Sequence, residues 1–230
     1  PDMTTRRITS VAIACAVAAL VLAIVATASL ALGSRQIAPA VVWDALVHGG
    51  VSQDAQVVTQ LRVPRTIAAL IIGGALGLAG SIMQAMTRNP LADPGVLGIN
   101  AGAAFVVVTV TAATGVTTRM GTLVASLLGA GVAAALVFAV SGSGGGSRSR
   151  LALAGIAVSA ALASLTQAVL AANQYAFNEF RYWASGSLEG VDMASVVAAG
   201  AVIACGGVVA ALISSALGVL AIGEDTAVSL

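Results

Sequence analysis

Arg62 and Arg65 stand three residues apart, with Pro64 stiffening the chain between them. A guanidinium group presents its N–H donors as a planar fork that matches the oxygens of a carboxylate or a phosphate. The pair therefore predicts a contact with an acidic group. The residues alone leave two partners equally open, an acidic protein surface and the phosphates of lipid headgroups.

Other chemistry is missing from the sequence. It contains no lysine, so the G-x-x-x-x-G-K-[ST] loop that binds ATP phosphates cannot form. The glycine-rich segment Ser141 to Ser149 lacks that lysine and a preceding strand, and it is predicted to be a flexible loop. Cys15 and Cys205 lie in apolar runs and are interpreted as small hydrophobic residues. We expect no catalytic residue, no metal site and no cofactor bound directly by this chain.

The composition predicts the elements that position the two arginines. Of the 230 residues, 59% are apolar and 8% are charged, which is typical of an integral membrane protein. Six uncharged runs are each longer than the roughly 20 residues that a membrane-crossing helix requires. We therefore predict an all-α integral membrane protein with one transmembrane domain over residues 1–230. Its six helices are expected at about 11–32, 66–87, 95–114, 121–140, 151–172 and 193–216.

The helix predicted at 66–87 separates two groups of arginines. At about 1.5 Å per residue it reaches about 33 Å, enough to cross a hydrocarbon core of about 30 Å. Arg62 and Arg65 then lie on one side of the membrane and Arg88 on the other. Six spans divide the ten arginines equally between the two sides, but the first helix has extra weight, and Arg6 and Arg7 place the N-terminus in the cytoplasm.

Small residues recur at every fourth position along the same predicted helix. They are Ala69, Gly73, Gly77, Ser81 and Ala85. Such a ridge lets another backbone approach closely, which is how membrane helices associate. The spacing therefore indicates a central helix that is surrounded by protein.

The two longest polar connections, 36–61 and 173–192, contain every Trp and Tyr of the sequence. Aromatic residues gather at the membrane–water interface, so an interfacial belt is the favoured interpretation. Within the first connection, Pro39 to Val47 is predicted to form a short helix along the membrane.

Neutral polar side chains mark the helix predicted at 151–172. Ser159, Ala163 and Thr166 share one face, and Gln167 lies beside them. Two interpretations remain open. The face lines a weakly polar pathway for a large solute, or the hydroxyl groups only bond to neighbouring carbonyl groups.

Several motifs together resemble the FecCD-type permeases, the membrane subunits of ABC importers for ferric siderophores, haem and cobalamin. They are Arg62-Val-Pro-Arg65, Met83-Gln84, Arg88-Asn-Pro-Leu-Ala-Asp-Pro-Gly95, Leu97-Gly98, Leu153-Ala-Gly155, Tyr182-Trp183, Gly186-Ser-Leu188 and Leu220-Ala-Ile-Gly-Glu224. The resemblance implies a permease subunit, not an enzyme, that passes a ferric siderophore or similar metal chelate into the cytoplasm. Haem and cobalamin are the alternative cargoes. A secondary transporter or channel and a non-transporting scaffold are less favoured, because neither explains the motifs at both ends of helix 66–87.

The family pattern also implies residue roles and partners. Arg62 and Arg65 match arginines that pair with glutamates of an extracytoplasmic substrate-binding protein. The segment that couples to a separate ATPase subunit, which binds the ATP, corresponds to Leu220, Gly223, Glu224, Asp225 and Ala227. Asn89, Ser147, Arg148 and Ser149 are gate candidates. Arg148 is bulkier than the small polar gate residues of relatives, and the favoured interpretation is that it points into the cytoplasm as an ordinary positive-inside residue. We further expect a second permease copy or homologous permease, a location in the cytoplasmic membrane and no nucleic-acid partner. Relatives usually have ten helices, so the sequence is expected to be an N-terminal part.

Overall fold

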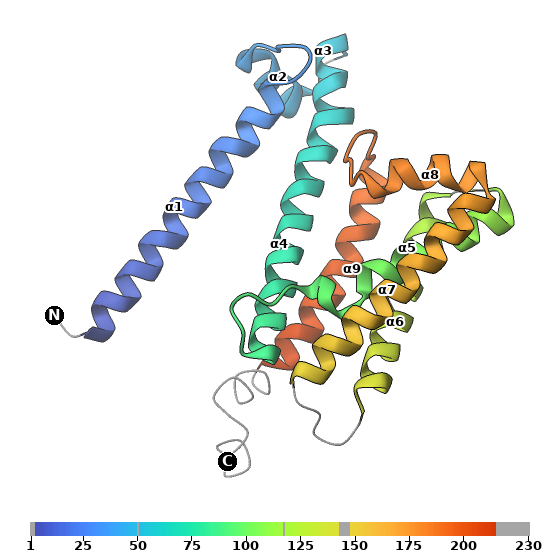
Figure 1. The fold of residues 1–230 in the computed structure, drawn as a ribbon. Coiled ribbons are helices and arrows are strands. Elements are labelled where there is room, and N and C mark those ends of the chain that lie inside the picture. The colour runs from blue at the N-terminus through green and yellow to red at the C-terminus, as the bar shows by residue number, and fades with distance from the viewer. Residues whose placement is uncertain (1–2, 50, 117, 143–147, 215–230) are drawn as a thin grey trace. The chain divides into compact units, whose positions relative to one another are not determined.

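The computed structural model describes residues 3–49, 51–116, 118–142 and 148–214, and all regular elements within these ranges are helices (Figure 1). In chain order they are α1 (Met3–Ala31), α2 (Pro39–His48), α3 (Gln53–Gln56), the π-helix η1 (Val57–Arg62), α4 (Val63–Thr87), the 3-10 helix η2 (Pro94–Leu97), α5 (Ile99–Thr114), α6 (Arg119–Ser141), α7 (Arg148–Ala172), α8 (Gln174–Ala184) and α9 (Met193–Leu212).

Among the described residues, five segments are long and apolar enough to cross a membrane: Thr9–Ala31, Gln53–Thr87, Arg119–Ser141, Arg150–Ala172 and Met193–Leu212. The sixth apolar helix, α5, is shorter. The expected helix at 95–114 begins only at Ile99, because residues 94–97 form a 3-10 turn and Gly98 adopts a left-handed conformation with φ 73°. The remaining 16 residues of α5 reach about 24 Å, which is less than a typical hydrocarbon core.

The chain divides into two compact units, which are described separately. The first contains residues 1–72 and 188–198, and the second contains residues 73–187 and 199–230. Helices α4 and α9 each contribute residues to both units.

In the first unit, the connection between α1 and α4 folds into three short helices, α2, α3 and η1. The short helix expected over Pro39 to Val47 is confirmed as α2, which begins with Pro39 in its first turn and ends at Gly49, a left-handed glycine with φ 63°. Ser52 then caps α3, its Oγ accepting a hydrogen bond from the amide of Ala55. From α3 the chain continues through η1 into α4 without a break (Figure 1).

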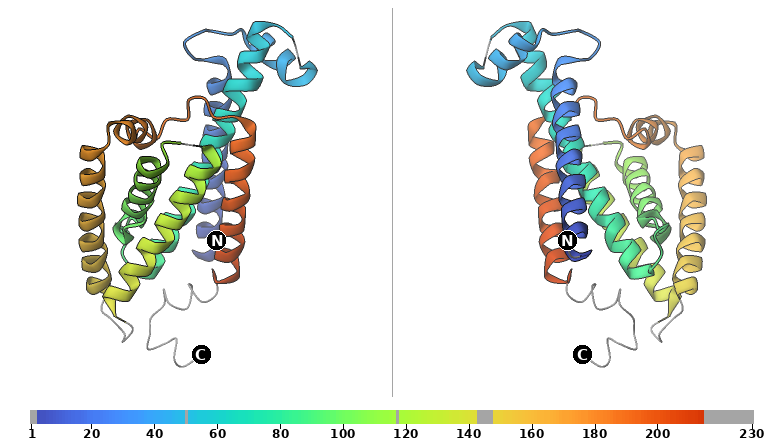
Figure 2. Two further views of the ribbon diagram at one scale, coloured as in Figure 1. Left: turned by 90° about the vertical axis from the view of Figure 1, so that its right-hand side faces the viewer. Right: turned by 90° about the vertical axis from the view of Figure 1, so that its left-hand side faces the viewer.

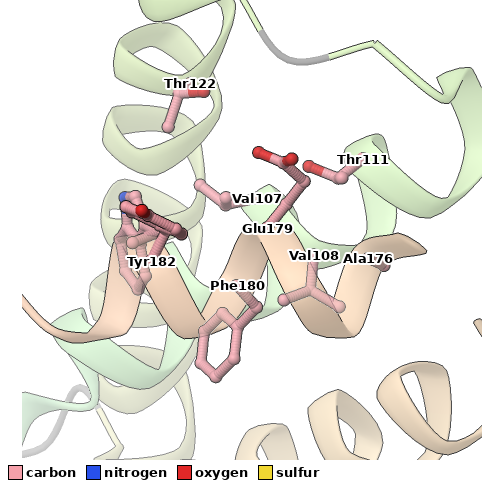
Figure 3. A pocket seen from close by; sticks show the side chains of 9 residues that line it. Val107, Val108, Thr111, Thr122, Ala176, Glu179, Phe180 and Tyr182 are labelled. Carbon is pink, nitrogen blue, oxygen red and sulfur yellow. The ribbon is translucent and has the colours of Figure 1, made fainter. Parts of the chain in front are cut away.

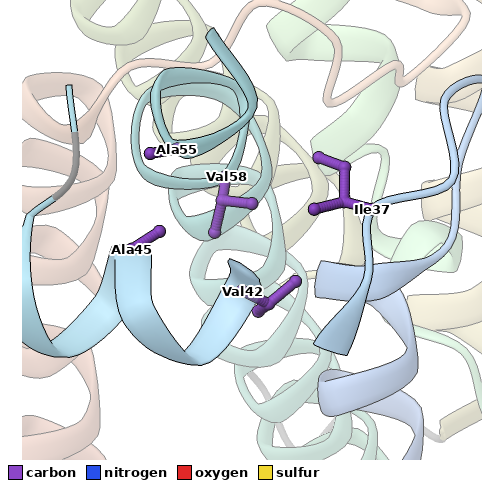
Figure 4. Close-up of a cluster of buried hydrophobic side chains, with 5 residues drawn as sticks. All are labelled: Ile37, Val42, Ala45, Ala55 and Val58. Carbon is purple, nitrogen blue, oxygen red and sulfur yellow. The ribbon is translucent and has the colours of Figure 1, made fainter. Parts of the chain in front are cut away.

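A cluster of buried apolar side chains holds these short helices together (Figure 4). Its members are Ile37, Val42, Ala45, Ala55 and Val58. Leu30 and Ala31, from the last turn of α1, pack against the cluster. The cluster therefore joins the end of α1 to α2, α3 and η1.

In the second unit, Figure 2 shows α5 between α6 and α7, with α8 running across one end. The closest approach is between Gly102 of α5 and Gly129 of α6, where a Cβ atom built on either glycine would lie 2.3 Å from the carbonyl oxygen of the other. On α6 the buried residues Ala125, Gly129, Ala133 and Val137 recur at every fourth position. Small residues thus let two membrane helices pack backbone against backbone.

The ridge predicted on α4 is not packed in this way. Its five small residues are exposed or half-buried. A Cβ atom at Gly73 or Gly77 would meet no other atom within 4 Å in the described part of the chain. The expectation that this face is surrounded by protein therefore stays a prediction.

Candidate functional site

Arg65 is exposed on the first turns of α4. Within the described ranges its guanidinium group forms no hydrogen bond and no ion pair. An exposed guanidinium without an internal partner is available to bind a carboxylate of another protein. The contact with an acidic partner that the sequence predicts for Arg65 stays a prediction.

Arg62 lies one turn earlier and is only half-buried, not exposed. Its Nη1 donates to the carbonyl oxygen of Leu30 at 2.8 Å, and its Nη2 donates to the carbonyl oxygen of Arg35. Both acceptors belong to the end of α1 or the connection that follows it. The two arginines, equivalent in the sequence motif, thus have different surroundings.

A third arginine is also engaged. Nε of Arg35 lies 3.0 Å from the buried Oδ1 of Asp54, an ion-pair distance without an aligned hydrogen bond. Nη1 of Arg35 donates to Oε1 of Gln53 at 3.4 Å. Asp54 therefore compensates the charge of Arg35 at this end of the first unit.

The Asn-Pro-Leu-Ala-Asp-Pro-Gly block builds the turn between α4 and α5. Oδ1 of Asn89 accepts a hydrogen bond from the amide of Leu91 at 2.9 Å, and Oδ1 of Asp93 accepts one from the amide of Gly95 at 2.6 Å. These side chains close two successive turns in place of backbone carbonyl groups. The side-chain oxygen of Asn89, a residue predicted as a gate candidate, thus accepts a hydrogen bond within its own turn.

The residues of the polar face predicted on α7 differ in how far they are buried. Thr166 is buried, and its Oγ1 donates to the carbonyl oxygen of Leu162 at 2.8 Å. Ser159 is half-buried, and its Oγ would lie 3.3 Å from a Cβ atom at Gly98. Ala163 and Gln167 are exposed. Of the four candidates, only these last two present an open surface.

Other candidates lie outside the described residues. Ser147 and the expected coupling residues Leu220, Gly223, Glu224, Asp225 and Ala227 belong to this group. The backbone of Arg148 and Ser149 begins α7, but their side chains are outside the description.

A pocket of about 160 Å³ lies between α5, α6 and α8 (Figure 3). Phe180 and Trp183 form one wall, with ring centroids 5.7 Å apart, and Glu179 contributes a carboxylate to the lining. This pocket was not predicted, because residues 173–192 were expected to form a polar connection. The residue that could have indicated helix α8, which forms one side of the pocket, is Asn173. Its Oδ1 caps α8 by accepting a hydrogen bond from the amide of Ala176 at 2.9 Å.

The sequence matches the profile of the FecCD transport family over residues 8–230. The ferric enterobactin transport system permease protein FepD of Escherichia coli (strain K12) is 41% identical over 214 residues, covering 92% of this chain and 64% of that protein. The Fe(3+)-citrate import system permease protein YfmD of Bacillus subtilis (strain 168) is 34% identical over 187 residues, covering 81% of this chain and 54% of that protein. The chain thus spans less than two thirds of the length of these relatives.

A solved structure has the same fold. It is described as a metal-chelate type ABC transporter in an inward-facing conformation, and it superimposes with a TM-score of 0.74 at 24% identity, over 92% of this chain and 65% of that one. The apolar helices and the permease relatives identify a multi-pass membrane protein. Since the family profile matches almost every residue and the fold agrees, the chain belongs to the FecCD transport family.

Proposed function

We propose that the chain is part of the membrane-spanning permease subunit of an ATP-driven importer, and that it passes a ferric siderophore or a similar metal chelate into the cytoplasm. The observation that carries this proposal is the family match over residues 8–230, supported by the 41% identity to a ferric enterobactin permease protein. The sequence given contains no lysine and therefore no Walker A loop, so we assign ATP binding and hydrolysis to a separate subunit.

The proposed direction of transport assigns the two ends of α4 to different partners. The N-terminal end, with exposed Arg65, faces the extracytoplasmic side and meets an acidic substrate-binding protein. The opposite side faces the cytoplasm together with the N-terminus, where the segment Leu220 to Ala227 meets the ATPase subunit. A second permease, identical or homologous, completes the pathway, and the exposed Ala163 and Gln167 of α7 are candidates to line it.

The direct test is uptake into proteoliposomes that contain the intact permease, its ATPase subunit and its binding protein. A radioactive ferric siderophore should accumulate only when ATP is enclosed on the ATPase side, and haem and cobalamin should not compete. Accumulation without ATP would instead support a secondary transporter. Competition by haem or cobalamin would reassign the cargo while leaving the importer proposal in place.

The coupling segment is tested by the substitution Ala227→Trp. A bulky side chain where this segment meets the ATPase subunit should reduce ATP-driven uptake but leave binding-protein docking intact. Normal uptake by this variant would contradict the assignment of the segment. Ala227→Ser is the matched control, because it adds only one oxygen atom.

A further inference from the structure

The C-terminal end of α1 needs hydrogen-bond donors that its own sequence does not provide. The last turn of the helix contains no basic residue, and the final carbonyl groups of any α-helix lack partners within the helix. Here Ala28 accepts from the amide of Leu32 at 2.8 Å, and Ala31 accepts from the amide of Ile37 at 3.3 Å. The carbonyl group of Leu30 accepts from Arg62, 32 residues further along the chain.

The shape of the Arg62 side chain suits this position. Its two Nη atoms bond to two different carbonyl groups, those of Leu30 and Arg35, so the guanidinium spans the segment between them. Gly33 leaves room for it, since a Cβ atom there would lie 3.0 Å from Nη2 and 3.3 Å from Cζ. An ammonium group on a lysine is a compact point charge and cannot span the same two acceptors as a rigid fork.

The contacts continue on both sides of Arg62. The side chain of Arg35 forms an ion pair with Asp54, and the buried cluster of Figure 4 joins the same segments. One turn further along α4, the hydroxyl groups of Ser29 and Thr66 lie within hydrogen-bond distance at 2.9 Å. The positive charge of Arg62 also lies at the negative end of the α1 helix dipole, which favours it there.

We infer that the two arginines of the Arg-Val-Pro-Arg motif have separate tasks: Arg62 is a positioning residue that holds the end of α1 and the α1–α2 connection against the start of α4, and Arg65 contacts the partner. We name the pair of contacts from Arg62 to Leu30 and Arg35 the Arg62 brace. The task of Arg65 rests on the proposed docking function. The Arg62 brace does not depend on that function, because all of its atoms belong to this chain.

Hydrogen–deuterium exchange of the intact permease in nanodiscs, with no binding protein present, tests the brace. In Arg62→Ala and Arg62→Lys, peptides covering residues 28–41 should exchange about tenfold faster, as expected for loss of a hydrogen bond from a charged donor. Arg65→Ala should exchange like the unmodified protein. Arg62→Lys is the decisive variant, because it retains the positive charge and removes the planar guanidinium group. It also tests the inference if the alanine variant does not fold.

Two results would overturn the inference. One is unchanged exchange over residues 28–41 in Arg62→Lys, which would mean that charge alone suffices. The other is an equal increase in Arg65→Ala, which would remove the division of tasks. A separate affinity measurement with the binding protein distinguishes the docking proposal: unchanged affinity in Arg65→Ala would refute docking through Arg65 and leave the brace intact.

Discussion

Gly129 offers a direct test of how tightly α5 and α6 are packed. A Cβ atom at this position would lie 2.3 Å from the carbonyl oxygen of Gly102 and 3.0 Å from the Cβ of Val106. Ordinary contacts of a Cβ atom begin near 3.4 Å, so Gly129→Ala must separate the two backbones by about 1 Å. Both obstacles are backbone or near-backbone atoms, which cannot rotate away.

The expected cost follows from this geometry. Inserting a carbon atom into a well-packed interface lowers the free energy of unfolding by about 1–3 kcal/mol, and separating the helices weakens many dispersion contacts at once. The matched control is Gly131→Ala on the same helix, where a Cβ atom meets nothing within 4 Å. That control should be neutral or gain up to about 1 kcal/mol from the higher helix propensity of alanine.

Reversible unfolding in mixed detergent micelles, followed by circular dichroism, compares the two variants. Gly129→Ala should unfold at a lower denaturant fraction than the unmodified protein, and Gly131→Ala should not. If both variants unfold alike, the close contact between α5 and α6 does not exist in the membrane-folded protein, and the steric reasoning fails.

Three further predictions concern local contacts and topology. Asn173 caps α8 and also donates from Nδ2 to a carbonyl group of α5 at 3.3 Å. Asn173→Ala should therefore lower the free energy of unfolding by about 2 kcal/mol, and Asn173→Asp, which keeps the cap but loses the Nδ2 bond, by about half of that. No loss in Asn173→Asp would contradict the bond to α5, and equal losses in the two variants would contradict the cap. Asp93→Ala should cost about 1 kcal/mol by removing the acceptor of the turn before α5, whereas Asp93→Asn should cost much less in the same unfolding assay. Cysteines introduced at Gly49 and Gly115 should react with an impermeant thiol reagent from outside the cell and one at Gly145 should not; the reverse pattern would invert the proposed orientation.

The sequence alone determined the class of the protein, its family and most of its helices. Long uncharged runs predict helices because an unpaired backbone group is too costly in hydrocarbon, so a spanning segment must satisfy its hydrogen bonds within itself. The short helix α2 was also predictable, since Pro39 marks its start locally. The start of α5 was missed because the turn before it depends on Asp93 and Gly98, whose conformations are not visible in an average of hydropathy.

The tertiary structure decided which of two similar patterns is buried. Small residues recur at every fourth position on both α4 and α6, but only the α6 stripe has a helix against it in the described chain. Periodicity identifies a face of a helix and contains no information about its neighbour. For the same reason the sequence could not distinguish Arg62 from Arg65, which have the same side-chain chemistry. They differ in their contacts, because the end of α1 and the connection after it, more than 25 residues away in sequence, lie against Arg62.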